Sequence, residues 1–164
     1  MIGILIGNVI ALIASILMVY SGFIKNKKKI ISTQTIQIAL SVISNMILGG
    51  ITGAIINFIN CIRNILCYKD KLTKFKKLII IVGGVVISLY FNNMGVIGLL
   101  PIIAFVIYTI LMNIEDVIKF KLIIILSMIM WLIYDIYIIS YTSAIFDFLH
   151  IIANIISIYK IKKV

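Results

Sequence analysis

The side chains best suited to chemistry are amides, carboxyls, an imidazole and an indole that interrupt long apolar runs of the sequence. Two groups of three recur at helical spacings: Asn57, Asn60 and Asn64, and then Asp147, His150 and Asn154. Residues three and four positions apart share one face of an α-helix. Each group is therefore predicted to form a polar stripe that can hydrogen-bond a solute or another helix.

The same spacing gives two further polar stripes. One comprises Gln34, Gln37, Ser41, Ser44 and Asn45, and the other comprises Ser127, Trp131, Tyr134 and Asp135. An amide or charged group left unpaired in hydrocarbon costs several kcal/mol, so we expect all four stripes to face the interior of a bundle or a wet cavity. The residues predicted to bind a small polar solute are Ser41, Asn57, Asn60, Trp131, Asp147, His150 and Asn154.

A purely structural role competes with solute binding at some of these positions. Ser41, Ser44 and Gln34 would serve equally well as hydrogen-bonded contacts between helices. His150 is suited to relaying protons and equally to a structural hydrogen bond. Trp131 is predicted to line the solute path, because it lies too deep in its apolar run for an interfacial aromatic belt.

Arg63 is the only arginine in the sequence, and it lies within an apolar run. Its side chain is long enough to extend toward the lysine-rich end of that run, which is the structural interpretation. The functional alternative is that Arg63 holds an anionic group of a solute. Cys61 and Cys67 fit neither a disulfide framework nor a zinc site, so we expect both to be small core residues.

The composition requires a membrane around these stripes. Hydrophobic residues make up 63% of the 164 residues and charged residues 12%, whereas soluble domains contain roughly 45–50% apolar and about 25% charged residues. The length suits a single all-helical membrane domain of seven spans with short loops. The predicted spans lie near 2–24, 30–49, 52–68, 75–91, 94–113, 120–139 and 142–159.

Basic residues gather after every second predicted span. Of the 15 lysines and arginines, all but Arg63 lie within four segments, 25–29, 69–77, 119–121 and 160–163. This asymmetry is typical of cytoplasmic loops and predicts an outside N-terminus and a cytoplasmic C-terminus. The net charge of +10 then reflects topology, so the lipid bilayer is an expected partner and nucleic acid is not. The first run is expected to remain as an uncleaved helix.

The chain also contains an internal repeat at a shift of 90 residues. Residues 52–65 and 142–155 are identical at seven of fourteen positions. The same shift aligns the second predicted helix with the sixth and the first with the fifth, and it leaves the fourth unpaired. The prediction is a 3+1+3 bundle: a first three-helix unit in 1–68, a connector helix in 69–93 and a second unit in 94–164. Both units would have the same orientation, with a solute path at their interface.

Two family resemblances rest on these residues. Trp131, Tyr134 and Asp147, the last sixteen positions after the tryptophan, resemble the signature of the sixth and seventh helices in the SWEET and PQ-loop transporter superfamily. Ser41 and Asn57 keep the same interval in the first unit. This resemblance implies a seven-helix transporter of a small solute.

The chain is similar over nearly its whole length to YgjV-type bacterial inner-membrane proteins. The similarity includes the segment Asn60-Cys61-Ile62-Arg63 and the acidic Asp147 seven residues before Asn154. It implies a multi-pass protein of the bacterial inner membrane and names no substrate.

Proline usage departs from the SWEET pattern, which has prolines at hinge positions in both units. Pro101 is the single proline of this chain, and Ala11 occupies the position that matches it in the repeat. A proline inside a membrane helix frees a carbonyl and permits a kink, so we predict a hinge at Pro101.

No motif of a soluble enzyme is present: the sequence has no Gly-rich phosphate loop, no His-Glu-x-x-His and no nucleophile elbow. We therefore expect no enzyme activity, no cofactor and no metal. The favoured function is a transporter or facilitator of a small polar solute, and the asymmetry of Asn57 against Asp147 suits a cationic or hydroxyl-rich solute or proton coupling. The alternative is a non-transporting membrane scaffold or partner subunit, and either protein is compatible with a homo-oligomer.

Overall fold

The computed structural model describes residues 2–47, 51–92, 95–137 and 141–163. Within those ranges the chain forms seven α-helices and no strand. The helices are α1 Ile2–Phe23, α2 Lys27–Ile47, α3 Ile51–Tyr68, α4 Lys74–Tyr90, α5 Leu99–Leu111, α6 Val117–Tyr137 and α7 Tyr141–Lys162. The prediction of seven helices is thus confirmed for the described residues, and most helix ends agree with it to within a few residues.

Three helices begin at the lysine-rich end of the bundle, and each begins with a capping side chain. Asn26, Thr73 and Asp116 precede α2, α4 and α6, and each accepts a hydrogen bond from a backbone N–H of the first turn at 2.8–3.3 Å. Short polar residues are favoured here because the first turn of a helix leaves its N–H groups without internal partners. Local chemistry therefore explains why the chain turns back where it does.

The start of α5 differs most from the prediction, because the helix begins at Leu99 and not near residue 94. A turn precedes it, in which Gly95 has a φ of 56°, a value that side chains disfavour. Pro101 consequently lies in the first turn of α5, where a proline costs no intrahelical hydrogen bond. The reason for expecting a hinge, a proline in a helix interior, does not apply at this position.

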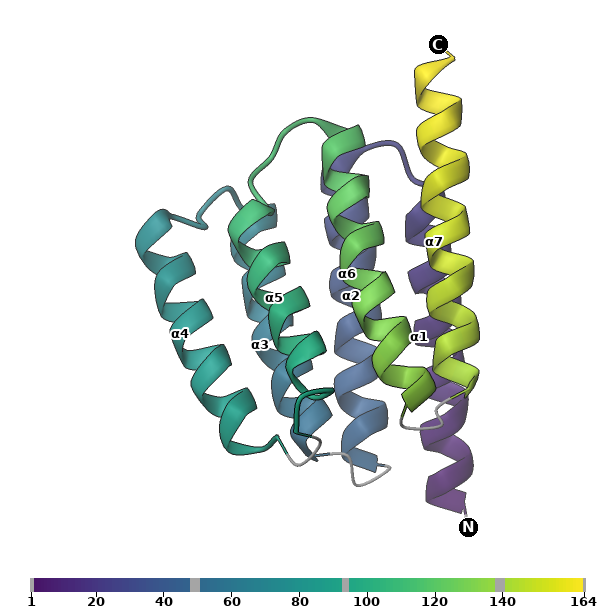
Figure 1. Cartoon of the computed structure of the whole chain (residues 1–164). Helices are drawn as coiled ribbons and strands as arrows, with labels where there is room; N and C mark the ends of the chain where they lie inside the picture. Colours follow the sequence, from purple (N-terminus) through teal and green to yellow (C-terminus); the bar gives the residue numbers. More distant parts are fainter. Residues whose placement is uncertain (1, 48–50, 93–94, 138–140, 164) are drawn as a thin grey trace.

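The helices stand in two facing rows with α4 at one edge (Figure 1). In the first row α2 packs between α1 and α3, and in the second α6 packs between α5 and α7. The rows meet where α7 packs against α1, and α4 contacts both α3 and α5 at the opposite edge. Since α1, α3, α5 and α7 all end at the upper end of Figure 1, the lysine-rich segments gather there.

The outer surface of the bundle is apolar. α1 alone exposes Leu5, Val9, Leu12 and Ile16 among other large aliphatic side chains. Within the described residues, the helical stretches long and apolar enough to cross a membrane are Leu5–Phe23, Val117–Tyr134 and Ser143–Lys162. Ala54–Tyr68 and Leu99–Leu111 are apolar but shorter. The arrangement of apolar side chains outside and polar stripes inside is the one expected for a bundle in lipid.

The lysine-rich end of the bundle is closed by an apolar cluster between the rows. Its fully or nearly fully buried members are Ile30, Ile31, Cys67, Leu72, Tyr108, Met112, Phe120, Ile123 and Ile124. They come from the beginnings of α2 and α6, the ends of α3 and α5, and the loop after α3. The Tyr108 and Phe120 rings lie 5.8 Å apart and tie α5 to α6. No comparable cluster of described residues closes the other end.

Hydrogen bonds between the rows gather at this closed end. Those between described residues join Ser21 to His150, Gly22 to Lys121, Phe23 to Ser157, Gln34 to Tyr108, Arg63 to Thr109, Cys67 to Met112 and Leu72 to Asn113. Each involves the last part of α1, the last part of α5 or the two residues that follow α5. The two rows are therefore fastened at the lysine-rich end.

Two neighbouring glycines in α4 provide a test of the packing against α5. A Cβ atom at Gly84 would lie 2.5 Å from Cε1 of Phe105, whereas a Cβ at Gly83 would meet nothing within 4 Å. We expect Gly84→Ala to lower the free energy of unfolding by about 1–2 kcal/mol, because the buried ring must move. The matched control Gly83→Ala should be neutral or stabilising by up to about 1 kcal/mol. Reversible unfolding in detergent measures both, and equal effects would contradict the described contact.

Candidate functional site: a polar cavity between the two rows

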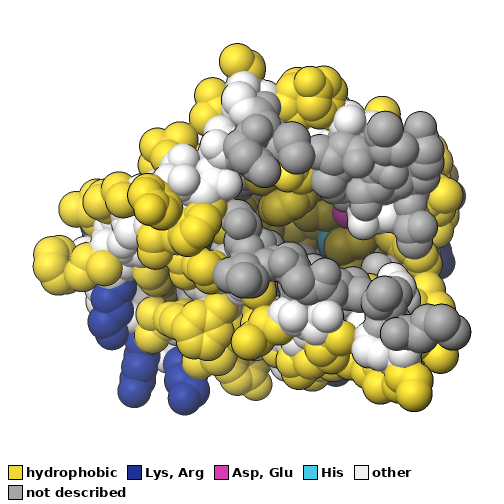
Figure 2. Space-filling model, turned by 90° about the horizontal axis from the view of Figure 1, so that it is seen from below, with side chains coloured by type: hydrophobic (Ala, Val, Ile, Leu, Met, Phe, Trp, Pro, Cys, Tyr) yellow, Lys and Arg dark blue, Asp and Glu magenta, His cyan; other side chains and the backbone are white. Residues whose placement is uncertain are grey.

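A cavity of about 310 Å³ lies between the two rows, on the open side of the apolar cluster. Its lining comes from every helix except α4 among the described residues. Figure 2 shows a hollow at the end of the bundle opposite the lysines, with an acidic side chain and the single histidine inside it. The size is at the lower end of the range for sites that bind small molecules, about 300–1,000 Å³.

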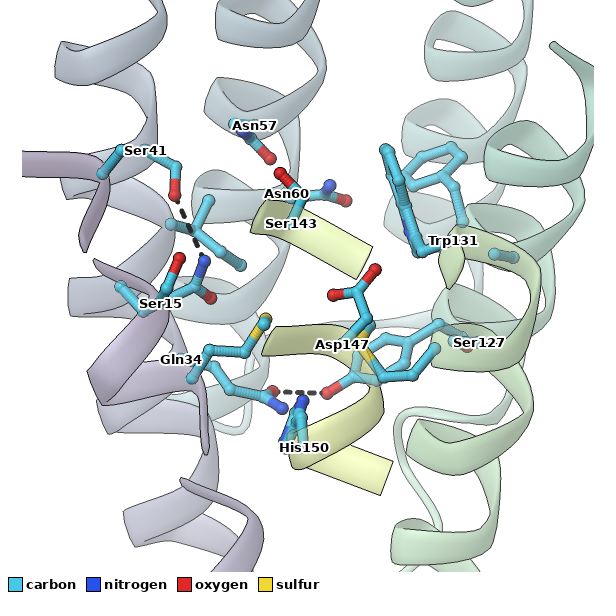
Figure 3. Close-up of a pocket in the computed structure, with 18 of the residues that line it drawn as sticks. Ser15, Gln34, Ser41, Asn57, Asn60, Ser127, Trp131, Ser143, Asp147 and His150 are labelled. Carbon is cyan, nitrogen blue, oxygen red and sulfur yellow. Dashed lines mark hydrogen bonds between the residues drawn. The ribbon is translucent and has the colours of Figure 1, made fainter. Parts of the chain in front are cut away.

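Six of the seven residues predicted to bind solute line this cavity: Ser41, Asn57, Asn60, Trp131, Asp147 and His150. Figure 3 shows the Asp147 carboxylate directed into the space between them, with Asn57 and Asn60 on one side and Trp131 on the other. Asn57 and Asp147 each lie six residues after the start of their helix, which is about 9 Å along the axis. The structure thus brings together side chains that the sequence placed about ninety residues apart.

Other predicted positions lie elsewhere. Asn154 does not line the cavity; it is fully buried beyond the floor, where Nδ2 donates to the His150 carbonyl oxygen at 2.9 Å. Ser44 lines the cavity and also donates to the Gly7 carbonyl oxygen at 2.8 Å, so it joins α1 to α2. The side chains of Asn45 and Asp135 lie outside the described part of the structure.

His150 forms part of the cavity floor and is only 1% exposed. Its Nε2 lies 3.2 Å from Oγ of Ser21, and that hydroxyl donates to the Met18 carbonyl oxygen at 2.7 Å. Because the hydroxyl proton is used by Met18, Nε2 is the donor to Ser21, and Nδ1 is then an acceptor in a neutral ring. Proton relay by His150 stays a prediction.

Several buried polar atoms in the lining have no protein partner among the described residues. They are Oδ1 of Asn60, Oγ of Ser127 and Nδ1 of His150. Buried polar atoms in proteins almost always find a hydrogen-bond partner, and water or a ligand supplies it where protein does not. The cavity therefore has hydrogen-bonding capacity available for a polar guest.

Arg63 corrects the structural interpretation drawn from the sequence. Its side chain does not emerge among the exposed lysines; it stays buried in the cavity wall at 4% exposure and reaches only as far as Thr109 near the end of α5. Nε and Nη2 donate to Oδ1 of Asn64 at 3.1 and 2.9 Å, and Nη1 donates to Oγ1 of Thr109 at 3.2 Å. The guanidinium carbon lies 4.6 Å from the Tyr108 ring centre and 5.8 Å from that of Phe105. These contacts hold Arg63 inward.

Lys121 belongs to one of the four basic segments that were predicted to lie on the cytoplasmic side. The structure buries it completely in α6. Its Nζ donates to the Gly22 carbonyl oxygen at 2.8 Å and contacts Oδ1 of Asn154 at 3.4 Å. A cation is favourable at the C-terminal end of α1, where the last carbonyl groups lack helical partners. Lys121 therefore joins α1, α6 and α7 just beyond the cavity floor.

Some lining residues were missed by the sequence analysis. They are Ala11, Ser15, Met18, Ile38, Ala104, Phe105, Tyr108, Met128 and Ser143. The repeat offered a signal for six of them, because the shift of 90 pairs Ser15 with Phe105, Met18 with Tyr108 and Ile38 with Met128. The first and fifth helices carry few polar residues, so no stripe on them pointed to this face.

The fold and the cavity define an all-helical membrane protein with a polar chamber inside the bundle. The model of the Imp-YgjV family, described as bacterial inner membrane protein, matches residues 5–164. The chain belongs to that family, which confirms the expected relationship and the inner-membrane location. No match was found among curated proteins or among solved structures.

Proposed function

We propose that the protein is a transporter or facilitator that moves a small polar solute across the bacterial inner membrane. The observation that carries the proposal is the polar cavity itself, which lies inside an apolar bundle and has polar atoms available for a guest. Polar and ionisable groups inside a membrane protein are costly and most often mark a solute path. The walls that hold Asp147, Asn57 and Asn60 would provide the hydrogen bonds, and Trp131 a flat apolar surface.

The proposal includes seven spans in a parallel 3+1+3 repeat, as in SWEET-like transporters. In support, fourteen of the twenty described lining residues form pairs 90 positions apart: Ser15/Phe105, Met18/Tyr108, Gln37/Ser127, Ile38/Met128, Ser41/Trp131, Asn57/Asp147 and Asn60/His150. The unpaired α4 contacts α3 and α5 and contributes nothing to the described lining. A chamber built from equivalent positions of two like-oriented units is typical of repeat transporters.

The proposed topology gives the cavity a direction. The lysine-rich end is cytoplasmic under the positive-inside rule, so the N-terminus and the hollow of Figure 2 would face outward. The apolar cluster and the hydrogen bonds between the rows close the cytoplasmic end. The described form would thus be an outward-open one.

Flux through proteoliposomes tests the function, with a panel of labelled small solutes. Asp147→Ala and Trp131→Ala are expected to lower uptake of the transported solute at least about tenfold, because the first removes a hydrogen-bonding side chain of the chamber and the second its flat apolar surface. The matched controls Phe148→Ala and Ile129→Ala lie on the same two helices, and both residues are exposed on the outside of the bundle. They should leave uptake within about twofold of the parent protein.

Two results would contradict the proposal. Uptake that survives both cavity substitutions in folded protein would remove the site. Absence of flux for every solute class, together with loss of stability in Asn57→Ala, would favour the scaffold or partner-subunit alternative, in which the polar stripes serve packing. Cross-linking in native membranes would then show whether the partner is a second copy of this chain.

A further inference from the structure

Arg63 is a buried cation in the cavity wall for which the described residues provide no counter-ion. No carboxylate of the described residues lies within 4.0 Å of its guanidinium, and the one ion pair among them joins Lys28 to Asp70 at the surface. Asp147 lines the same cavity but stands beyond that distance. A buried charge without a paired opposite charge is strongly destabilising, by several kcal/mol. Such a charge calls for an explanation.

The protein contacts of Arg63 fix its position without neutralising it. Asn64 and Thr109 are neutral acceptors, and they occupy three of the five N–H donors of the guanidinium. The rings of Tyr108 and Phe105 contribute a cation–π attraction, which is worth about 0.5–2 kcal/mol. Two N–H donors and most of the positive charge therefore remain for whatever fills the cavity.

From this geometry we infer that the solute carries an anionic oxygen group, a carboxylate or a phosphate, which binds to Arg63. Asn64 occupies the Nε–Nη2 edge of the guanidinium, and one N–H on each of Nη1 and Nη2 is left to donate to the oxygens of such a group. The restraint by Asn64 and Thr109 holds these donors in place, so little side-chain freedom is lost when the anion binds. This inference rests on the proposed function for the identity of the guest as a solute, and it names an anionic group where the sequence analysis favoured a cationic or hydroxyl-rich solute.

Asp147, in the same cavity, places a second requirement on the charge of the solute. A carboxylate on the opposite wall repels a simple anion and attracts the ammonium group of a zwitterion. A zwitterion and a simple anion share the group that Arg63 recognises, so both satisfy the inference. They differ in their response to Asp147→Asn, which should weaken binding of a zwitterion and strengthen binding of a simple anion.

Equilibrium binding to the purified chain in nanodiscs tests the inference. Calorimetry would compare lactate with its uncharged amide, lactamide, and would include alanine and inorganic phosphate. Trp131 is the single tryptophan and lines the cavity, so its fluorescence gives a second readout. We expect lactate, alanine or phosphate to bind and lactamide to bind at least about tenfold more weakly, because hydrogen bonds to charged groups exceed neutral ones.

Substitution of Arg63 completes the test. Arg63→Gln should weaken binding of the anionic ligand about 10- to 100-fold, and Arg63→Lys should retain part of it because the charge remains without the fork. The control Lys28→Gln removes an exposed basic residue far from the cavity and should leave binding unchanged. If Arg63→Gln does not fold, the comparison of lactate with lactamide in the parent protein decides alone.

The outcomes separate the inference from the function on which it rests. Equal affinity for lactate and lactamide, or full lactate affinity in folded Arg63→Gln, would overturn the anion site even if a neutral solute is transported. Binding of the anions without flux in proteoliposomes would leave the site standing and overturn the transport function. Binding that disappears in Arg63→Gln together with flux of the same anion supports both.

Discussion

Gly22→Val is expected to prevent stable folding, with a loss of about 3 kcal/mol or more. A Cβ atom at this position would lie 2.7 Å from the Cβ of Ala153 and 3.0 Å from side-chain atoms of Asn154 and His150. Overpacking of a well-packed site typically costs about 1–3 kcal/mol, and forcing α1 from α7 would also break the bond between Ser21 and His150, worth about 1 kcal/mol. The atom that is met first belongs to a short, fully buried side chain, so it cannot swing away.

The control for this prediction is Gly3→Val on the same helix. A Cβ at Gly3 meets nothing within 4 Å, so the added side chain would face lipid. Thermal unfolding followed by fluorescence-detected gel filtration measures both variants. Similar unfolding temperatures for the two would show that the close contact between α1 and α7 does not exist in the protein.

Asn154→Leu should lower the free energy of unfolding by about 2–4 kcal/mol. The substitution deprives the buried Lys121 ammonium of one of its two acceptors and removes the bond from Nδ2 to the His150 carbonyl oxygen. Hydrogen bonds to charged groups contribute about 1.5–3 kcal/mol, and a buried cation that loses a partner cannot regain one from water. We therefore assign most of the loss in free energy of unfolding to the Lys121 ammonium, which stays buried with one acceptor fewer.

A double substitution tests that assignment. Replacing both partners by apolar groups of similar shape is close to neutral, whereas removing one is not. We expect Lys121→Met in the Asn154→Leu background to recover at least about half of the lost stability. The control Ile155→Leu is exposed on the same turn and should change stability by less than about 0.5 kcal/mol. Additive losses in the double variant would contradict the described pairing.

The helices were largely predictable because each long apolar run of a membrane protein must form a helix in lipid, so the lengths of the runs give the helix positions. Capping residues such as Asn26, Thr73 and Asp116 mark helix starts locally, and the predicted ends follow them closely. The predicted start of α5 was wrong because a turn at 95–98 precedes the helix. This turn depends on the positive φ of Gly95, which a hydrophobicity pattern does not reveal. Whether all seven helices cross the membrane stays a prediction, since α2 and α4 each begin with several lysines.

The cavity was predictable where polar residues repeat on one face and unpredictable where contacts cross between the rows. The stripes containing Asn57 and Asp147 identify their own lining faces from spacing alone. The places of Lys121, Arg63 and Asn154 depend on which helix ends meet, and no single segment contains that information. The spacing put Asn154 on the same stripe as Asp147, but it could not show that the Asn154 side chain would bond to Lys121.

The uneven fastening of the two rows bears on how any cargo would move. Under the proposed transport function, a bundle whose rows are hydrogen-bonded together at the lysine-rich end and hollow at the other would admit a solute from one side of the membrane only. Discharge to the far side would require the contacts among the ends of α1 and α5 to be exchanged for water while the mouth shuts. The transport rate would then be limited by this conformational change and would saturate with solute concentration, unlike diffusion through a permanently open channel.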